Sequence, residues 1–275
     1  MALPVYPSDL TDQEWALLAP LIPVSKPHGR PRSRDMRQIT NGVFYVLRTG
    51  CPWRYLPLEY GPWQTVYYYF RQWRRDGTWL EIHARLRELA RLHAGRDPTP
   101  SAAIIDSQSV KTMAGGVRGY DGAKKMAGRK RHILVDTQGW LLSVVVHSAA
   151  LPDRQGGRLV LTAVGEHFPR LQRIWADQGY TGELQRWTAE RYGIVLEVVY
   201  PPTRQLKRYA PELLEEAGSR GGFQVLPRRW IVERTFSWLG RQRRLSKDYE
   251  RLVETSETWI YLVGIRLLLA RLTRA

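Results

Sequence analysis

A chain of 275 residues is too long for one small core and too short for three domains, so we expect two domains. The chain has 42 Lys and Arg against 26 Asp and Glu, a formal net charge of +16, which favours nucleic acid as a partner over an anionic membrane surface. A single cysteine, Cys51, excludes a disulfide framework and a cysteine-rich zinc site, and this predicts a reducing, cytoplasmic compartment.

Neither end of the chain predicts a membrane segment. The first ten residues, MALPVYPSDL, have no basic start and no long apolar run, so no signal peptide is expected. The apolar run at residues 259–272 is interrupted by Arg266 and Arg271, whereas a bilayer needs about 20 apolar residues. We therefore predict a packed helix there and no membrane partner.

Residues 1–95 carry only helical patterns and are predicted to form a DNA-binding domain. The first helix starts with a capping box, in which Thr11 is followed three residues later by Glu14. Apolar residues at helical spacing define the second helix, and Gly50 predicts its end. Four helices are expected, one from residue 11 and the others at 35–48, 63–75 and 78–95.

The stretch RDPTPS at residues 96–101 ends this pattern, and we predict a linker there to a second domain at 102–275. This domain opens with the strand AAIID and with a hairpin, KRHILVDTQGWLLSVVVH, that turns through Asp136–Gly139. The remaining elements are a helix at 153–167, the strand LQRIWAD, a helix at 182–192, the strand IVLEVVY, a helix around Glu233 and a helix from about Glu254. Three strands followed by alternation predict an α/β fold, a mixed β-sheet flanked by helices.

Two aspartates close predicted apolar strands, Asp106 in AAIID and Asp177 in IWAD. Because catalytic acids in α/β sheets lie at the carboxyl ends of strands, this position indicates a candidate site. Capping of the following turn would explain either aspartate alone. Two aspartates in the same setting, in a chain with few acids, leave both interpretations open.

A third acid, Glu233, lies in the arginine-rich stretch RRWIVERTFSWLGRQRR at residues 228–244. At about 100° per residue, the residues that share its helix face are Leu226, Arg229, Ser237, Gly240 and Arg244. An intrahelical ion pair between Arg229 and Glu233 would explain the glutamate without a site. That pair does not explain why the small residues Ser237 and Gly240 keep the same face open.

Three carboxylates from two strands and one helix would make an all-oxygen site. Mg²⁺ and Mn²⁺ prefer such ligands. Two such ions held about 4 Å apart can activate a water or a 3′-hydroxyl and stabilise the departing oxygen of a phosphodiester. The sequence therefore predicts Mg²⁺ or Mn²⁺ as the cofactor, as a pair of ions.

Several long strings resemble the DDE transposases of bacterial insertion sequences, specifically the insertion-sequence-five-like group. The strings are IIDSQSVKT, RGYDGAKKMAGRKRHILVDTQG, ADQGYTG and LPRRWIVERTFSWLGRQRRLSKDYE, with LTDQEWALLAPLIP, GRPRSRDMRQITNGVFYVLRTGCPWRYLP and WQTVYYYFRQWRRDGTW before them. The resemblance implies an RNase H-like catalytic domain in which Asp106, Asp177 and Glu233 are the metal-binding triad. The related insertion-sequence-four branch has a tyrosine and a lysine where this chain has Leu226 and Gly240, and Arg241 or Arg244 would have to replace that lysine.

Basic residues in three segments are predicted to contact DNA. The glycine-rich segment that leaves the strand of Asp106 contributes Lys111, Lys124, Lys125, Arg129 and Lys130. The stretch around Glu233 contributes Arg229, Arg234, Arg241 and Arg244, and the helix at 63–75 contributes Arg71, Arg74 and Arg75. Such phosphate contacts give affinity rather than sequence choice. A solvated mobile loop is the alternative for the first segment, and the aromatics of the helix at 63–75 fit a core as well as base contacts.

Three further aspartates are weaker candidates for metal ligands: Asp121, Asp136 and Asp153. Local capping explains Asp136, which lies in the hairpin turn, and Asp153, which starts a predicted helix. His132 and His147 fall on the hairpin strands and are predicted to pack or to form hydrogen bonds rather than to act as a base.

These patterns together predict an enzyme, a DNA transposase with endonuclease activity. It would bind the terminal inverted repeats of its own element, cleave the DNA and join the 3′ ends to target DNA by two-metal-ion transesterification. It would act in the cytoplasm, with the nucleoid when bound to DNA, as a homodimer or larger assembly that holds two element ends. The alternatives are a transposase-derived DNA-binding protein without catalysis and a non-transposing RNase H-like nuclease.

Overall fold

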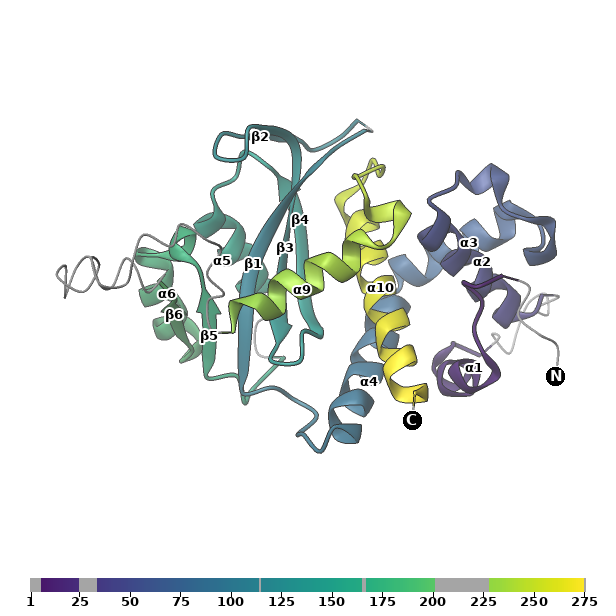
Figure 1. The fold of residues 1–275 in the computed structure, drawn as a ribbon, viewed down its shortest axis with the longest axis horizontal. Helices are drawn as coiled ribbons and strands as arrows, with labels where there is room; N and C mark the ends of the chain where they lie inside the picture. Colours follow the sequence, from purple (N-terminus) through teal and green to yellow (C-terminus); the bar gives the residue numbers. More distant parts are fainter. Residues whose placement is uncertain (1–5, 25–33, 114, 165–166, 201–227, 275) are drawn as a thin grey trace, which may run out of the picture.

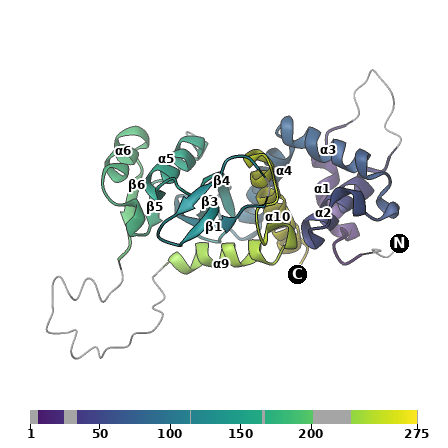
Figure 2. The ribbon, with the colours of Figure 1, turned by 90° about the horizontal axis from the view of Figure 1, so that it is seen from above.

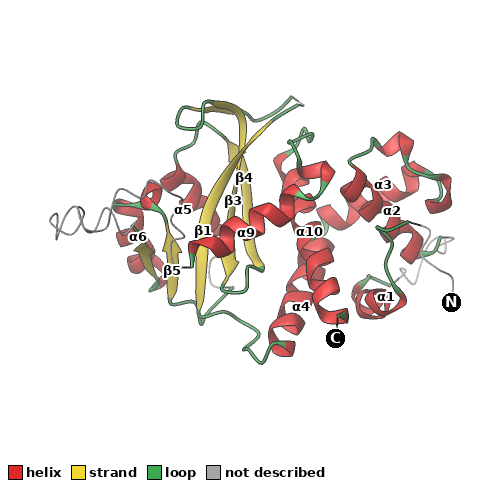
Figure 3. Cartoon of the chain, viewed as in Figure 1, coloured by secondary structure: helices red, strands yellow, loops and turns green. Residues whose placement is uncertain are grey.

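The computed structural model describes residues 6–24, 34–113, 115–164, 167–200 and 228–274. A twisted β-sheet lies in one half of the molecule and a group of helices in the other, and the described chain begins and ends in the helical half (Figure 1). Figure 3 shows that strands are confined to the sheet half and that the described chain before the sheet contains helices and loops but no strand. The predicted α/β class is confirmed.

The N-terminal region forms four α-helices, α1 (Asp12–Leu18), α2 (Met36–Thr49), α3 (Trp63–Arg75) and α4 (Thr78–His93). Short 3₁₀ turns η1 (Ala19–Leu21), η2 (Trp53–Tyr55) and η3 (Leu58–Tyr60) connect them. Both halves of the predicted capping box are present, because Glu14 N donates to Thr11 Oγ1 and Thr11 N donates to Glu14 Oε2. Gly50 ends α2 with φ of 71°, a conformation in which a side chain would be strained.

The sheet has six strands, β1 (Ala102–Lys111), β2 (Gly119–Asp121), β3 (Met126–Asp136), β4 (Leu141–Ser148), β5 (Arg173–Ala176) and β6 (Val195–Val198). β1 pairs antiparallel with β3 on one side and parallel with β5 on the other, and β5 pairs parallel with β6. β4 and the short β2 pair antiparallel with β3. Apart from β2, the order β4-β3-β1-β5-β6, with three antiparallel and then two parallel strands, is that of an RNase H-like domain.

The predicted order of elements is confirmed, and two details of it are wrong. The short β2 is an additional strand. β1 does not end at Asp106 but continues to Lys111, because Ser107–Lys111 keep pairing with β3, from Ser107 opposite His132 to Lys111 opposite Gly128. The polar side chains of this extension find partners in the protein, as Ser107 does with Asp153 and Ser109 with Asp121.

Helices cover both faces of the sheet. α5 (Asp153–Val164) and α6 (Glu183–Tyr192) lie on one face, and α9 (Arg229–Gly240) lies along the other (Figure 2). β1 alternates between the two cores, since Ile104 packs with the α9 side while Ala103 and Ile105 pack with α5 and α6. The residue two positions after Ile104 is Asp106, so this aspartate faces α9.

The helical region and the sheet share one hydrophobic core. The last helix, α10 (Val253–Thr273), packs against β4 and also against α4 of the N-terminal region. Trp259 of α10 stacks on Phe70 of α3 with ring centroids 4.5 Å apart, and Arg266 pairs with Glu14 of α1 at 3.2 Å. The division into domains 1–95 and 102–275, with a linker at 96–101, stays a prediction.

The C-terminal apolar run is a packed helix, as predicted. Ten residues of α10 are buried against β4 and the N-terminal helices. In the part of the chain that the structure describes, no helix combines the length and the apolar character needed to cross a membrane.

Glu257 of α10 makes the stability of this packing depend on pH. Its Oε1 accepts a hydrogen bond from Val146 N of β4, and burial raises the pKa of its carboxyl from 4.5 to about 7. Because the folded-state pKa is above the unfolded one, the contribution of Glu257 to stability is most favourable below pH 4.5 and is lost as the pH rises through 7. Glu257→Gln keeps the acceptor without the charge.

We expect Glu257→Gln to be more stable than the wild type at pH 8, by on the order of 3 kcal/mol or less, and equal to it at pH 4. Urea unfolding at the two pH values measures this difference, with the exposed Glu190→Gln as the matched control. An equal effect of Glu257→Gln at both pH values would contradict the prediction.

Candidate active site

Asp106 and Asp177 lie where the parallel strands β1 and β5 separate. The ladder between these strands ends at Ile104 opposite Trp175, two residues before each aspartate. Asp177 also caps the 3₁₀ turn η4 (Gln178–Tyr180), because its Oδ1 accepts a hydrogen bond from Gly179 N at 2.8 Å. The capping interpretation of Asp177 is therefore correct, and it leaves the second carboxylate oxygen free to take part in a site.

Glu233 comes to the same place from α9. Ile231, Val232 and Phe236 of α9 are buried, whereas 44% of the Glu233 side chain is exposed. Arg229 precedes Glu233 by one turn, as the sequence predicts.

A single nitrogen atom, Nη2 of Arg229, lies among all three carboxylates. It is 3.6 Å from Asp106 Oδ2, 3.9 Å from Asp177 Oδ2 and 3.8 Å from Glu233 Oε1. The intrahelical pair with Glu233 therefore exists, but it is one of three equivalent contacts. The three acids that the sequence selected converge on one point, which we call the acidic triad.

The acidic triad brings three carboxylates close together, and one of them, that of Asp106, is largely shielded from solvent. The Asp106 side chain is 15% exposed, and burial together with the neighbouring Asp177 carboxylate raises its pKa from 3.8 to about 6, against the lowering effect of Arg229. Like charges at close range favour a bound cation or a proton. Within the described part of the chain, the Arg229 guanidinium is the cation that lies within 4 Å of all three acids.

The donor atoms of the triad are all carboxylate oxygens, which suit Mg²⁺ and Mn²⁺ rather than zinc. Among the residues that the structure describes, no three His, Cys, Asp or Glu side chains are already gathered as ligands around one metal position. The carboxylate oxygens are therefore suitable ligands for the expected ions. In this structure, however, they surround the Nη2 atom of Arg229.

Two family models cover most of the chain. Residues 97–268 match the transposase DDE domain, and residues 10–83 match the putative transposase of the IS4/5 family. The chain belongs to the DDE transposase family. The resemblance found in the sequence strings is thereby confirmed, and the triad lies within the part that matches the DDE domain.

Two proteins of Burkholderia cepacia are similar to this transposase. The putative transposase for insertion sequence element IS402 is 28% identical over 166 residues, 58% of this chain and 70% of that protein. The insertion element IS402 uncharacterized 16.2 kDa protein is 33% identical over 123 residues, 42% of this chain and 79% of that protein. The crystal structure of the Mos1 strand transfer complex matches with 14% identity and a TM-score of 0.23, over 90% of this chain and 79% of that one.

A polar bridge beside the triad of the transposase connects β1, which carries Asp106, with β3 and with α5. Asp153, the first residue of α5, accepts hydrogen bonds from Ser107 Oγ at 2.9 Å and from Lys130 Nζ at 3.0 Å. Ser107 N in turn donates to Asp106 Oδ1 at 2.7 Å. The sequence indicated Asp153 as a helix cap and a weaker candidate for a metal ligand but not as part of this bridge, because contacts with residues 23 and 46 positions away leave no local signal.

The two strand histidines form a buried hydrogen-bonded pair, as predicted for residues that pack rather than act as a base. His132 Nδ1 lies 3.0 Å from His147 Nε2, and His132 Nε2 bonds to the Tyr180 hydroxyl. Burial lowers the pKa of His132 to about 3, so the ring is neutral at neutral pH. Gly156 of α5 allows this pair, since a Cβ there would lie 2.5 Å from both rings.

The remaining weaker candidates for metal ligands are engaged within the protein. Asp136 is fully buried, pairs with Arg91 and accepts hydrogen bonds from Gln138 N and Trp140 N in the hairpin turn. Asp121 accepts hydrogen bonds from Ser109 Oγ and from the backbone of the turn that follows β2. Both are structural acids in this transposase.

The basic residues predicted to contact DNA differ in exposure. The exposed ones are Arg71, Arg75, Lys111, Lys124, Lys125 and Arg241. The half-buried ones are Arg74, Arg229, Arg234 and Arg244, and the buried ones are Arg129 and Lys130.

The prediction that Arg129 and Lys130 contact DNA is wrong for this fold. The segment predicted as a loop becomes a strand at Met126, so both side chains enter the protein. Arg129 donates to carbonyl oxygens and pairs with Asp248 at 3.1 Å, and Lys130 bonds to Asp153 and to Leu151 O.

The shared polar face predicted for α9 is correct only as far as the helix extends. Ser237 and Gly240 are exposed like Glu233. Arg244 does not lie on this face, because α9 ends at Gly240 and Arg244 follows in the 3₁₀ turn η5 (Arg243–Leu245), where it pairs with Glu250. Arg244 therefore does not replace the lysine of the related branch, and Leu226 lies outside the described residues.

Helix α3 of the transposase has one core face and one polar face. Val66, Phe70 and Trp73 are buried, so two of its aromatics belong to the core. The exposed residues follow helical spacing along the opposite face, and they are Gln64, Tyr67, Tyr68, Arg71, Gln72 and Arg75. This surface is basic and aromatic, and we call it the α3 face.

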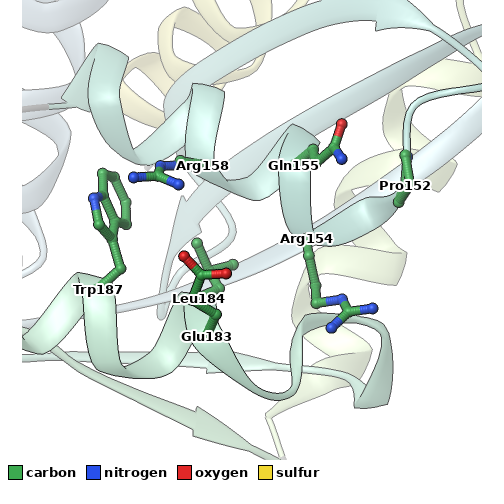
Figure 4. A pocket seen from close by; sticks show the side chains of 7 residues that line it. All are labelled: Pro152, Arg154, Gln155, Arg158, Glu183, Leu184 and Trp187. Atoms are coloured by element: carbon green, nitrogen blue, oxygen red, sulfur yellow. The ribbon is translucent and has the colours of Figure 1, made fainter.

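A groove of about 190 Å³ between α5 and α6 lies outside the triad. Figure 4 shows Arg154 and Arg158 of α5 facing Glu183 and Trp187 of α6 across it. The Arg158 guanidinium stacks on the Trp187 ring at 4.6 Å. The charges of the groove are mixed, so it does not select a ligand of one sign.

Proposed function

We propose that this chain is a DNA transposase that binds the terminal inverted repeats of its insertion sequence, cleaves the DNA and joins the 3′ ends to target DNA. The observation that carries the proposal is the convergence of Asp106, Asp177 and Glu233, from three separate elements, within a region that matches the transposase DDE domain.

Asp106, Asp177 and Glu233 would hold Mg²⁺ or Mn²⁺, as a pair of ions. When bound, such ions supply an activated oxygen nucleophile and stabilise the departing oxygen of the phosphodiester. The protein contributes position: Asp106 is held in the middle of β1, Asp177 is oriented by its bond to Gly179 N, and Glu233 is fixed by the buried side of α9. No side-chain nucleophile is required.

The positive charge of the protein surface favours DNA as the partner. The net charge of +16 and the α3 face favour a polyanion, and Lys124 and Lys125 add exposed positive charge in the segment between β2 and β3. We propose that the α3 face contacts the element ends and that a homodimer or larger assembly holds two of them.

Replacing Arg71 and Arg75 together with alanine should weaken binding of end DNA and reduce the dependence of log Kd on log salt by about 2, because two phosphate contacts are lost. Fluorescence anisotropy over a salt series measures both quantities. The control is Arg85→Ala, because Arg85 is an exposed arginine of the neighbouring helix α4. Arg91 is not suitable as a control because it is buried. An unchanged salt slope would exclude the α3 face from the interface.

The function itself is tested with purified protein, inverted-repeat DNA and Mg²⁺. We expect cleavage that exposes 3′-hydroxyl ends, joining of these ends to a second DNA, and loss of both with a chelator. Binding without any cleavage would instead support the non-catalytic DNA-binding protein, and cleavage without joined products would support the nuclease.

A further inference from the structure

We infer that Arg229 is the resident counter-cation of the acidic triad in the DNA-free protein, and that it must leave the triad before a divalent ion can bind. DNA would promote this exchange, because a phosphate offers the guanidinium another anion. The inference rests on the proposed function, which assigns the metal ions to the triad.

The position of Arg229 conflicts with a bound ion. Its Nη2 lies 3.6 to 3.9 Å from one oxygen of each acid, so it takes the space between the three carboxylates. Mg²⁺ lies about 2.1 Å from its oxygen ligands, so the acids would have to close in on the same region. A divalent ion and a guanidinium at this spacing also repel each other strongly.

The contacts that hold Arg229 are of a kind that can be exchanged. Distances of 3.6 Å and above are too long for hydrogen bonds, so the guanidinium is held by charge and not by directed bonds. Arg229 is the first residue of α9, and 19% of its side chain is exposed. Its guanidinium can therefore turn outward without breaking the helix.

A DNA phosphate gives the guanidinium a better partner. Guanidinium and phosphate form paired, charge-assisted hydrogen bonds, which the three long contacts in the triad do not provide. Arg229 is within reach of the position where a scissile phosphate would meet the triad, because it already touches all three acids. One side chain would thus make metal loading depend on DNA.

Such coupling is reciprocal. If DNA raises the affinity of the triad for the metal ion by a given factor, the ion raises the affinity for DNA by the same factor. A DNA-free protein would then carry little bound metal, and the active arrangement would form only on a substrate.

The test measures Mn²⁺ binding to the full-length protein without DNA, by electron paramagnetic resonance of the free ion. The variant is Arg229→Gln, which removes the charge and keeps a polar side chain of similar length. Arg243→Gln is the matched control, because it removes the same charge from an exposed residue of η5 that contacts none of the three acids. Asp106→Asn combined with Arg229→Gln reports Mn²⁺ bound elsewhere.

We expect Arg229→Gln to bind Mn²⁺ at least about tenfold more tightly than the wild type and Arg243→Gln, and the double variant to lose this gain. Adding a short inverted-repeat duplex should bring the wild type close to Arg229→Gln. Equal DNA-free affinity of wild type and Arg229→Gln would overturn the inference while leaving the metal site in place. Absence of triad-dependent Mn²⁺ binding in every protein, with and without DNA, would overturn the metal assignment of the proposed function.

Discussion

Asp106→Asn should lower the rate of DNA end cleavage by on the order of 10³-fold or more, with the affinity for end DNA changed by less than about threefold. Asparagine has the same shape and can still accept the hydrogen bond from Ser107 N, so β1 and its polar bridge should persist. What it lacks is the negative charge that a divalent ion needs as a ligand. Single-turnover cleavage and anisotropy measure the two quantities separately.

Asp177→Asn and Glu233→Gln should give the same division between cleavage and binding. Glu190→Gln is the matched control, because it removes one charge from an exposed position of α6. A single variant of the triad that cleaves at the wild-type rate would show that the corresponding residue is not a ligand. Equal losses of cleavage and binding would instead point to unfolding or to a role in DNA contact.

Arg129→Met should lower the free energy of unfolding by about 3–5 kcal/mol, the cost of leaving a buried charge without its partner. Arg129 is fully buried, and its guanidinium bonds to Asp248 and to the carbonyl oxygens of Val117, Glu250 and Arg251. These bonds attach β3 to the segment between η5 and α10. Methionine fills part of the volume but satisfies none of the oxygens.

Urea unfolding measures this effect, and Lys125→Met is its control, because Lys125 is exposed in the neighbouring turn. Adding Asp248→Leu to Arg129→Met should recover part of the loss, since it removes the unpaired carboxylate. If Arg129→Met has wild-type stability and weakened DNA binding, the result would support the DNA contact that the sequence predicted for Arg129.

Local patterns in the sequence were sufficient for the order of the main helices and strands and for selecting the three candidate acids. Helical spacing, the Thr11–Glu14 capping box and Gly50 located the N-terminal helices, because each signal acts within a few residues. The hairpin turn at Asp136–Gly139 is equally local, with Asp136 bonding to the turn and Gly139 at φ of 85°. The +16 charge and the match of Asp106, Asp177 and Glu233 to a family pattern likewise required no coordinates.

The partners of the charged side chains could be identified only from the tertiary structure. The sequence counted Arg129 and Lys130 with the DNA contacts, yet their partners Asp248 and Asp153 lie 119 and 23 residues away. Asp106 was expected at a strand end, but pairing with β3 extends β1 by five residues beyond it. Arg229 reaches Asp106 and Asp177 as well as Glu233 because α9 lies across the sheet. A charge is stabilised by whatever the fold places within a few ångströms, and periodicity along the chain carries no record of that distance.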